Sequence, residues 1–258
     1  MRLRVFGSGS QGNALAVRSG GTLLLLDCGF SCRELERRMA ACGVDADDVT
    51  AVLFTHDHID HCKAVATFHR HHPEVPLYAN GNTADAIATL SGVEDGWRVF
   101  ETSEPFAIGD VGVTTFPVPH DAADTVGYLF SDDSATLFVG TDMGVPTVSV
   151  KVALARATCA VLESNHDPTR RACSDRPPTR KQRIAGRCGH LSNQDAADLV
   201  RETAPQHLKT LLLAHLSRPC NAPHLALESM RQALADIGRS DVSLATLDQD
   251  EPSDLYVF

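Results

Sequence analysis

The chain has 258 residues, of which 43% are hydrophobic and 22% are charged, and its formal net charge is −10. This is the composition of a soluble globular protein. No apolar run reaches the roughly 20 residues that a membrane span requires, and the N-terminus lacks a signal-peptide pattern. We therefore expect a cytoplasmic protein with no membrane partner. The acidic charge alone disfavours nucleic acid as a partner, and the oligomeric state has no sequence signature.

Short apolar strands alternate with amphipathic helices, which is the pattern of an α/β protein. In the first part of the chain the pattern predicts strands at 2–6, 14–17, 23–27, 51–55 and 77–79. A capping box at Ser31 predicts a helix that runs to about residue 42, where Gly43 ends it. Further helices are predicted at 62–70 and 83–90.

The second part of the chain repeats this organisation. Strands are predicted at 111–116, 126–130, 136–140, 160–163, 210–214, 243–247 and 255–258. Helices are predicted at 147–157, 193–203 and 223–237. Two β-rich halves, each followed by helices, fit a four-layer αββα sandwich better than a doubly wound sheet. No linker or repeat divides the chain, so we expect one domain over residues 1–258.

The eight cysteines are scattered along the chain and form no CxxC pair. A structural zinc cluster of thiolates is therefore not expected. In a reducing compartment these residues act as small apolar side chains.

A dense cluster of metal-ligating residue types follows the predicted strand at 51–55, with His56, His58, Asp60 and His61 within six positions. Residues i and i+2 at an extended strand end point to the same side, so His56 and His58 can share one cation. The chain then turns, and Asp60 with His61 faces a second position. Imidazole and carboxylate ligands suit zinc, manganese or iron rather than calcium. The alternative is a set of hydrogen-bonded histidines without metal.

The HxHxDH motif after a strand resembles the signature of the metallo-β-lactamase superfamily. Within it, the chain is most similar to the bacterial YycJ/WalJ group, over nearly its whole length. The resemblance rests on the segments at 7–13, 26–31, 119–128, 163–167, 189–193 and 214–217. It implies the αββα fold and a site for two divalent metal ions, Zn²⁺ or Mn²⁺, with Fe²⁺ also possible.

The resemblance also implies the remaining ligands. His120 would complete the first metal's set, His215 would join Asp60 and His61 on the second metal, and Asp142 would bridge both. Asp27 would support the histidine loop without binding metal. The alternatives stay open: Asp27 and Asp142 as turn residues, and His120 and His215 as hydrogen-bonded core histidines.

Two further residues resemble the catalytic pair of the related nuclease RNase Z. Glu163 would orient His190 and stabilise its protonated form, so that His190 protonates the leaving alkoxide. Asp60 counts as catalytic as well as ligating. A purely structural Glu–His pair is the alternative.

A basic segment at 170–187 carries seven basic residues and one acidic residue, and it lies between Glu163 and His190. Its cations, Arg180, Lys181 and Arg183 above all, would hold substrate phosphate, as would His166. The alternative interpretation is a solvent-exposed loop with no role in binding. The resemblance implies a phosphodiester hydrolase, specifically a 5′→3′ DNA exonuclease in DNA repair. The alternatives are a small-molecule (cyclic nucleotide-type) phosphodiesterase and a non-catalytic metal-binding interaction module.

Overall fold

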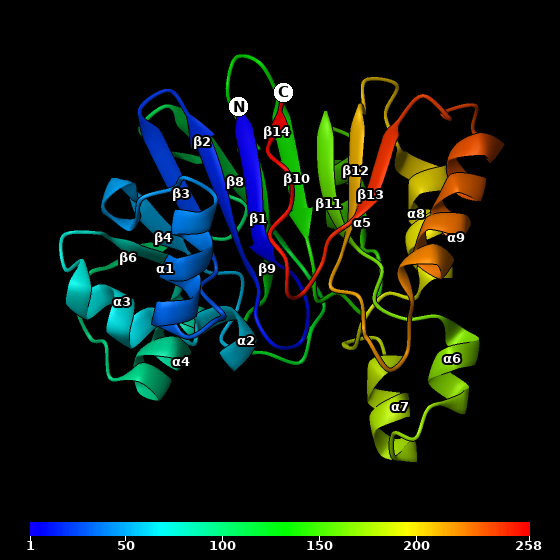
Figure 1. Ribbon diagram of the computed structural model, residues 1–258, viewed down its shortest axis with the longest axis horizontal. Coiled ribbons are helices and arrows are strands. Elements are labelled where there is room, and N and C mark those ends of the chain that lie inside the picture. Colours follow the sequence, from blue (N-terminus) through cyan, green and yellow to red (C-terminus); the bar gives the residue numbers. More distant parts are fainter.

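The computed structural model describes all 258 residues and contains two seven-stranded sheets packed face to face, with helices on both outer faces (Figure 1). The chain termini lie side by side at one end of the sheets, because β1 (Arg2–Gly7) pairs with β14 (Tyr256–Val257). No helix has the length and apolar character needed to cross a membrane.

The first sheet has the strand order β14-β1-β2-β3-β4-β5-β6. Its other strands are β2 (Ala14–Ser19), β3 (Thr22–Leu26), β4 (Ala51–Leu53), β5 (Leu77–Asn80) and β6 (Trp97–Phe100). Strands β3 to β6 run parallel, and β14 to β3 are antiparallel neighbours. Along this half the helical segments are α1 (Cys32–Ala41), η1 (Ala46–Asp48), α2 (Ile59–Cys62), α3 (Val65–His71) and α4 (Gly81–Ser91).

The second sheet has the strand order β13-β12-β11-β10-β9-β8-β7. Its strands are β7 (Phe106–Ile108), β8 (Val111–Pro117), β9 (Val126–Ser131), β10 (Thr136–Gly140), β11 (Cys159–Glu163), β12 (Thr210–Ala214) and β13 (Ser243–Thr246). Strands β10 to β13 run parallel. The helices are α5 (Val148–Leu154), α6 (Pro168–Cys173), α7 (Pro178–Ile184), α8 (Asn193–Thr203) and α9 (Pro223–Asp236).

Alternation along each strand divides the apolar residues among three cores. In β3, Leu24 and Leu26 point into the core between the sheets, while Leu23 and Leu25 pack with α1, α3 and α4. The strands of the second sheet are also buried on both faces. One face contributes to the core between the sheets, and the outer face packs with α5, α8 and α9. A strand buried on both faces reads as a continuous apolar run, which explains the sequence of β3. The predicted αββα sandwich is confirmed, with no large inserted domain.

The structure corrects several predicted elements. The helix predicted at 62–70 corresponds to α3, which begins only at Val65, and the short helix α2 precedes it. The strand predicted at 51–55 ends at Leu53. Strands β6 and β7 were not expected from the pattern, because they are short and partly exposed. The basic segment is not a simple loop: it contains α6 and α7, which lie beyond the second sheet (Figure 1). Both helices have a proline in the first turn, a favoured start signal.

Candidate metal centre

The candidate site lies where strand ends of the two sheets meet. The loop after β4 carries His56, His58, Asp60 and His61 from the first sheet. The loops after β8, β10 and β12 carry His120, Asp142 and His215 from the second sheet. Because the carboxyl ends of parallel strands share one edge of a sheet, residues far apart in the sequence reach the same place.

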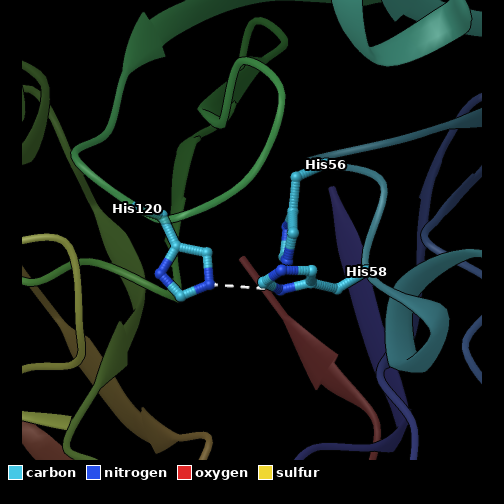
Figure 2. Close-up of side chains that lie close together, drawn as sticks. All are labelled: His56, His58 and His120. Carbon is cyan, nitrogen blue, oxygen red and sulfur yellow. Dashed lines mark hydrogen bonds between the residues drawn. The ribbon is translucent and has the colours of Figure 1, made fainter. Parts of the chain in front are cut away.

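His56, His58 and His120 form the first group of candidate ligands, with nitrogens that all lie within 4.8 Å of one another. Figure 2 shows the imidazole of His120 facing that of His58, with His120 Nε2 and His58 Nδ1 3.3 Å apart. Two ligand nitrogens of a tetrahedral zinc ion are separated by about 3.3 Å, given a Zn–N distance of about 2.0–2.1 Å. The observed spacing therefore fits a shared ion.

Asp60, His61 and His215 form the second group. Asp60 Oδ2 lies 3.9 Å from His61 Nε2 and 3.8 Å from His215 Nε2. Asp142 lies between the groups: its Oδ2 is 3.2 Å from His61 Nε2, and its Oδ1 is 3.9 Å from His120 Nε2. The structure thus brings together all seven residues expected to bind metal, with Asp142 in the position of a bridge.

Unsatisfied polar atoms show that this set fits cations. His56 Nε2, His215 Nε2 and Asp142 Oδ2 are buried and have no hydrogen-bond partner. Buried polar atoms without a partner are rare in native structures unless an ion or water satisfies them. Two histidines have their other ring nitrogen occupied: His120 Nδ1 lies 3.1 Å from the Gly189 carbonyl, and His61 Nδ1 lies 2.7 Å from Asp27 Oδ2. This arrangement directs Nε2 toward the metal.

The charges of the site favour cations as well. Burial lowers the pKa of His56 well below its usual value, so this imidazole is a neutral ligand. Burial also lowers the pKa of His215, but Asp142, Asp60 and Glu163 outweigh it and raise the pKa to about 10. Burial raises the pKa of Asp142, yet His215 and His61 hold it well below its usual value. Asp142 therefore stays ionised. Its negative charge favours either a proton on a neighbouring histidine or a metal ion, and the two compete for the same ligand nitrogen.

Asp27 contacts the histidine loop through its carboxylate. It follows β3, is buried, and accepts hydrogen bonds from the Thr55 backbone N–H at 2.9 Å and the Thr55 hydroxyl at 2.9 Å. It also contacts His61, as described above. Thr55 was not singled out from the sequence, although its place directly before His56 was the available signal. Asp27 fixes both the backbone and the ring orientation of the loop.

Glu163 and His190 form a pair beside the metal centre. Glu163 is fully buried, and its Oε1 lies 2.8 Å from His190 Nδ1. Its Oε2 accepts the backbone N–H groups of Met143 and Leu191. Burial raises the pKa of Glu163, but His190 outweighs it and lowers the pKa to about 2. Glu163 and His190 also lie close enough to Asp142 and His215 to share an ion. Because both oxygens of Glu163 are already hydrogen-bonded, we interpret it as a positioning carboxylate.

A cavity of about 180 Å³ opens onto the metal centre. Its lining includes five of the seven candidate ligands, His190, and the arginines Arg176, Arg180 and Arg183. Lys181 and His166 do not line it: Lys181 donates to the Ala172 carbonyl, and His166 is buried. Their predicted contact with substrate phosphate is therefore not supported.

The lining residues that sequence reasoning missed are Ser10, Asp121, Asn165, Arg176, Ile184, Gly189 and Ser217. Several of them lie in the segments that carry the family resemblance, but their types suggested no role.

Comparisons with known proteins agree with this geometry. The β-lactamase superfamily domain matches residues 22–216. The exodeoxyribonuclease YycJ of Bacillus anthracis is 33% identical over 240 residues, covering 92% of this chain and 90% of that protein. The exodeoxyribonuclease WalJ of Streptococcus pneumoniae is 31% identical over 240 residues, covering 91% and 89%. The crystal structure of the fold protein YhfI from Bacillus subtilis superimposes with a TM-score of 0.71 at 17% identity, over 98% of this chain and 99% of that one.

Fold and site together define a metal-dependent hydrolase with a centre for divalent metal ions. More particularly, the chain belongs to the metallo-β-lactamase superfamily and is a homologue of the exodeoxyribonucleases YycJ and WalJ. The predicted family is confirmed.

Proposed function

We propose that the protein is a dinuclear phosphodiesterase that degrades DNA as a 5′→3′ exonuclease in DNA repair, in the cytoplasm. The observation that carries the proposal is the Glu163–His190 pair, which stands at the metal centre next to a wall of arginines. A phosphodiester needs a proton for its leaving group and cations for its phosphates, and this arrangement supplies both. The relatives named exodeoxyribonucleases, at 33% and 31% identity, support DNA rather than RNA as the substrate.

We assign the ligands by group. His56, His58 and His120 would hold one ion, and Asp60, His61 and His215 the other, with Asp142 contacting both. Zn²⁺ and Mn²⁺ suit such ligands, and Fe²⁺ is compatible. Bound ions of this kind lower the pKa of water toward neutrality and neutralise developing charge on phosphate oxygens.

His190 provides the proton in this proposal. Its Nδ1 faces Glu163, so Nε2 is the nitrogen that is free to donate to the departing oxygen. Burial raises the pKa of Glu163, but His190 and His215 outweigh it and lower the pKa to about 2, so a charged carboxylate faces the His190 ring and orients it. Asp27 holds the histidine loop in place through its contacts with Thr55 and His61.

A second candidate function is the hydrolysis of small phosphodiesters. The net charge of −10 and the small cavity favour it, because a long acidic polymer is repelled by an acidic surface. The basic segment at 170–187 offsets this repulsion where the substrate would enter.

The test compares substrates with the metal-loaded protein. Labelled duplex DNA, a matched RNA, bis-p-nitrophenyl phosphate and cyclic nucleotides are each incubated with Zn²⁺ or Mn²⁺. We expect mononucleotides to be released progressively from the 5′ ends of DNA. Asp60→Ala, which removes one ligand, should be inactive, so that any activity it retains indicates a contaminating nuclease. Cleavage of the small esters alone would refute the nuclease proposal in favour of the second candidate.

A further inference from the structure

A further group of metal-ligating side chains lies between helices α1 and α3, outside the centre described above. Cys32 begins α1, Glu36 lies one turn later on the same face, and His71 ends α3. The two helices lie side by side over the outer face of the first sheet (Figure 1). The thiol sulfur, a carboxylate oxygen and an imidazole nitrogen of these residues all lie within 4.8 Å of one another. They share no residue with the candidate dinuclear centre.

The distances within this group fit a single tetrahedral ion. Glu36 Oε1 lies 3.1 Å from Cys32 Sγ and 3.3 Å from His71 Nδ1. Around a tetrahedral zinc ion, an oxygen ligand lies about 3.6 Å from a sulfur ligand and about 3.4 Å from a nitrogen ligand, given the usual bond lengths. Each observed distance is within about 0.5 Å of that geometry. Small rotations of the side chains would therefore bring all three atoms onto one ion.

The three residues differ in burial, and the order gives an ion a way in. His71 is exposed, Glu36 is half-buried and Cys32 is buried. An ion that arrives from solvent meets the imidazole and the carboxylate first and the thiol last. Burial raises the pKa of Cys32 to about 12, and Glu36 adds to this shift. Zinc deprotonates a coordinating thiol, so the ion takes the place of the thiol proton, which is released to water.

The surface beside the group attracts cations. Glu36 and His71 line an open groove of about 590 Å³, together with Asp45, Asp47 and the buried His72. No lysine or arginine is among the residues that line this groove. Carboxylates without basic neighbours raise the local concentration of cations. His72 Nδ1 already lies 3.3 Å from Asp47 Oδ1, so a water molecule from the groove is the simplest fourth ligand.

The types of ligand select among the possible metals. Sulfur, nitrogen and oxygen are all common ligands of zinc, whereas magnesium, calcium and manganese favour oxygen and bind thiolate poorly. The seven candidate ligands of the dinuclear centre offer only nitrogen and oxygen. The thiolate therefore distinguishes the two kinds of site chemically.

We propose that Cys32, Glu36 and His71 bind one zinc ion that links α1 to α3. Helix α1 follows the turn that contains Asp27 and Gly29, and α3 follows the histidine loop. An ion between the two helices would therefore connect the segments that flank this turn and this loop. Its role is structural, and it takes no part in hydrolysis.

The test uses cobalt as a probe, because a bond between Co²⁺ and a thiolate gives a near-ultraviolet charge-transfer band that nitrogen and oxygen ligands do not give. Co²⁺ is titrated into the full chain after bound metal has been removed with a chelator. We expect the band in the wild-type protein, and its loss when Zn²⁺ is added. Cys32→Ser should lose the band, and His71→Ala should weaken Co²⁺ binding at this site at least about tenfold, the scale set by residues that merely support a ligand. Cys173→Ser is the matched control and should keep the band, because Cys173 is exposed and lies outside the group.

A second measurement tests the link between the helices. Thermal midpoints of the wild-type protein and Cys32→Ser are compared with and without Zn²⁺. The difference between the two proteins should be larger with Zn²⁺, because only the wild type gains the additional ion. Elemental analysis of the zinc-loaded proteins should find one ion fewer per chain in Cys32→Ser.

Three results would overturn the inference. The first is a wild-type protein without the charge-transfer band. The second is a band that persists in Cys32→Ser, which would assign it to another thiol. The third is a difference in midpoint that Zn²⁺ leaves unchanged, which would show that no ion joins the helices. Circular dichroism spectra of the metal-free proteins show whether the variants fold like the wild type.

Discussion

Three residues of the candidate metal centre hold a left-handed backbone conformation that is unusual for side chains other than glycine. The φ angles are 60° at Asp27, 56° at Asp142 and 55° at His215. Such conformations cost on the order of 1–3 kcal/mol each and persist where the surrounding structure enforces them. All three follow strand ends, so the chain turns sharply just where its side chain enters the site. Asp and His are among the residue types that tolerate this conformation.

At the residue scale, His190 gives the most direct test of the mechanism. In the metal-loaded protein, His190→Ala should lower kcat for DNA hydrolysis by roughly 10²–10⁴-fold, the usual contribution of a general acid. The metal content, measured by elemental analysis, should stay the same, because His190 Nδ1 is already occupied by Glu163 Oε1 at 2.8 Å and the other seven candidate ligands are retained. A variant that loses an ion would show instead that His190 is a ligand.

At the element scale, the turn after β3 packs directly against the histidine loop. An ideal Cβ on Gly29 would lie 1.6 Å from the backbone oxygen of Asp60. That oxygen also accepts the backbone N–H of Asn13, which lies in the turn between β1 and β2. The turns after β1 and β3 are thus both connected to the histidine loop. The absence of a side chain at Gly29 is therefore a requirement of the site.

We predict that Gly29→Ala displaces Asp60 and weakens metal binding, which is measured as the loss of ions during dialysis against a weak chelator. Activity should fall in parallel. Gly81→Ala is the control, because an added Cβ in the first turn of α4 meets nothing closer than 3.9 Å. Full metal retention by Gly29→Ala would contradict this account of the loop.

The buried Arg38 connects helix α1 to strand β1 of the first sheet through hydrogen bonds. Its guanidinium donates to the carbonyls of Phe6 at 2.7 Å and Gln249 at 2.9 Å, bonds to Glu34, and lies over the ring of Phe30. Hydrogen bonds from a charged group contribute about 1.5–3 kcal/mol each.

Replacing Arg38 with leucine should therefore lower the free energy of unfolding by about 3 kcal/mol, because two buried carbonyls lose their donor. Urea denaturation at neutral pH measures the loss. The neighbouring Arg37 also pairs with Glu34 but is exposed. Arg37→Leu should leave the stability nearly unchanged, and equal losses in the two variants would assign the effect to Glu34 alone.

At the scale of the whole molecule, the two halves of the chain share a core. Residues of both sheets contribute to the cluster between them, for example Leu24 from β3 and Tyr128 from β9. The metal centre joins the same halves, because one sheet supplies the histidine loop and the other supplies Asp142 and His215. We therefore propose that residues 1–258 fold as one domain.

This proposal predicts a single cooperative unfolding transition. Trp97, the one tryptophan, lies in β6 and reports on the first half by fluorescence, whereas far-ultraviolet circular dichroism reports on the entire chain. In urea, with metal ions at a fixed concentration, the two signals should give the same midpoint and slope. Separate midpoints would show that the halves unfold independently and that each is a domain.

Most strands and helices, the family and the candidate ligands in the histidine motif were predictable without the structure. The elements and the histidine motif are local features: alternation within a strand, caps within a helix, and four candidate ligands within six positions, each readable from neighbouring residues. The metal-binding roles of His120, Asp142 and His215 required the family resemblance, since nothing local distinguishes them from turn or core residues.

Which basic side chains line the cavity depends on tertiary packing. The run at 170–187 reads as uniformly basic, but packing turns Arg176, Arg180 and Arg183 into the cavity and leaves Lys181 bonded to a carbonyl outside it. The same packing buries His166 outside the cavity lining and places the backbone of Asp60 where a side chain on Gly29 would lie. The physical reason is the same in each case. The direction of a side chain and the space beside it depend on segments distant in the sequence, which meet only when the two sheets pack together.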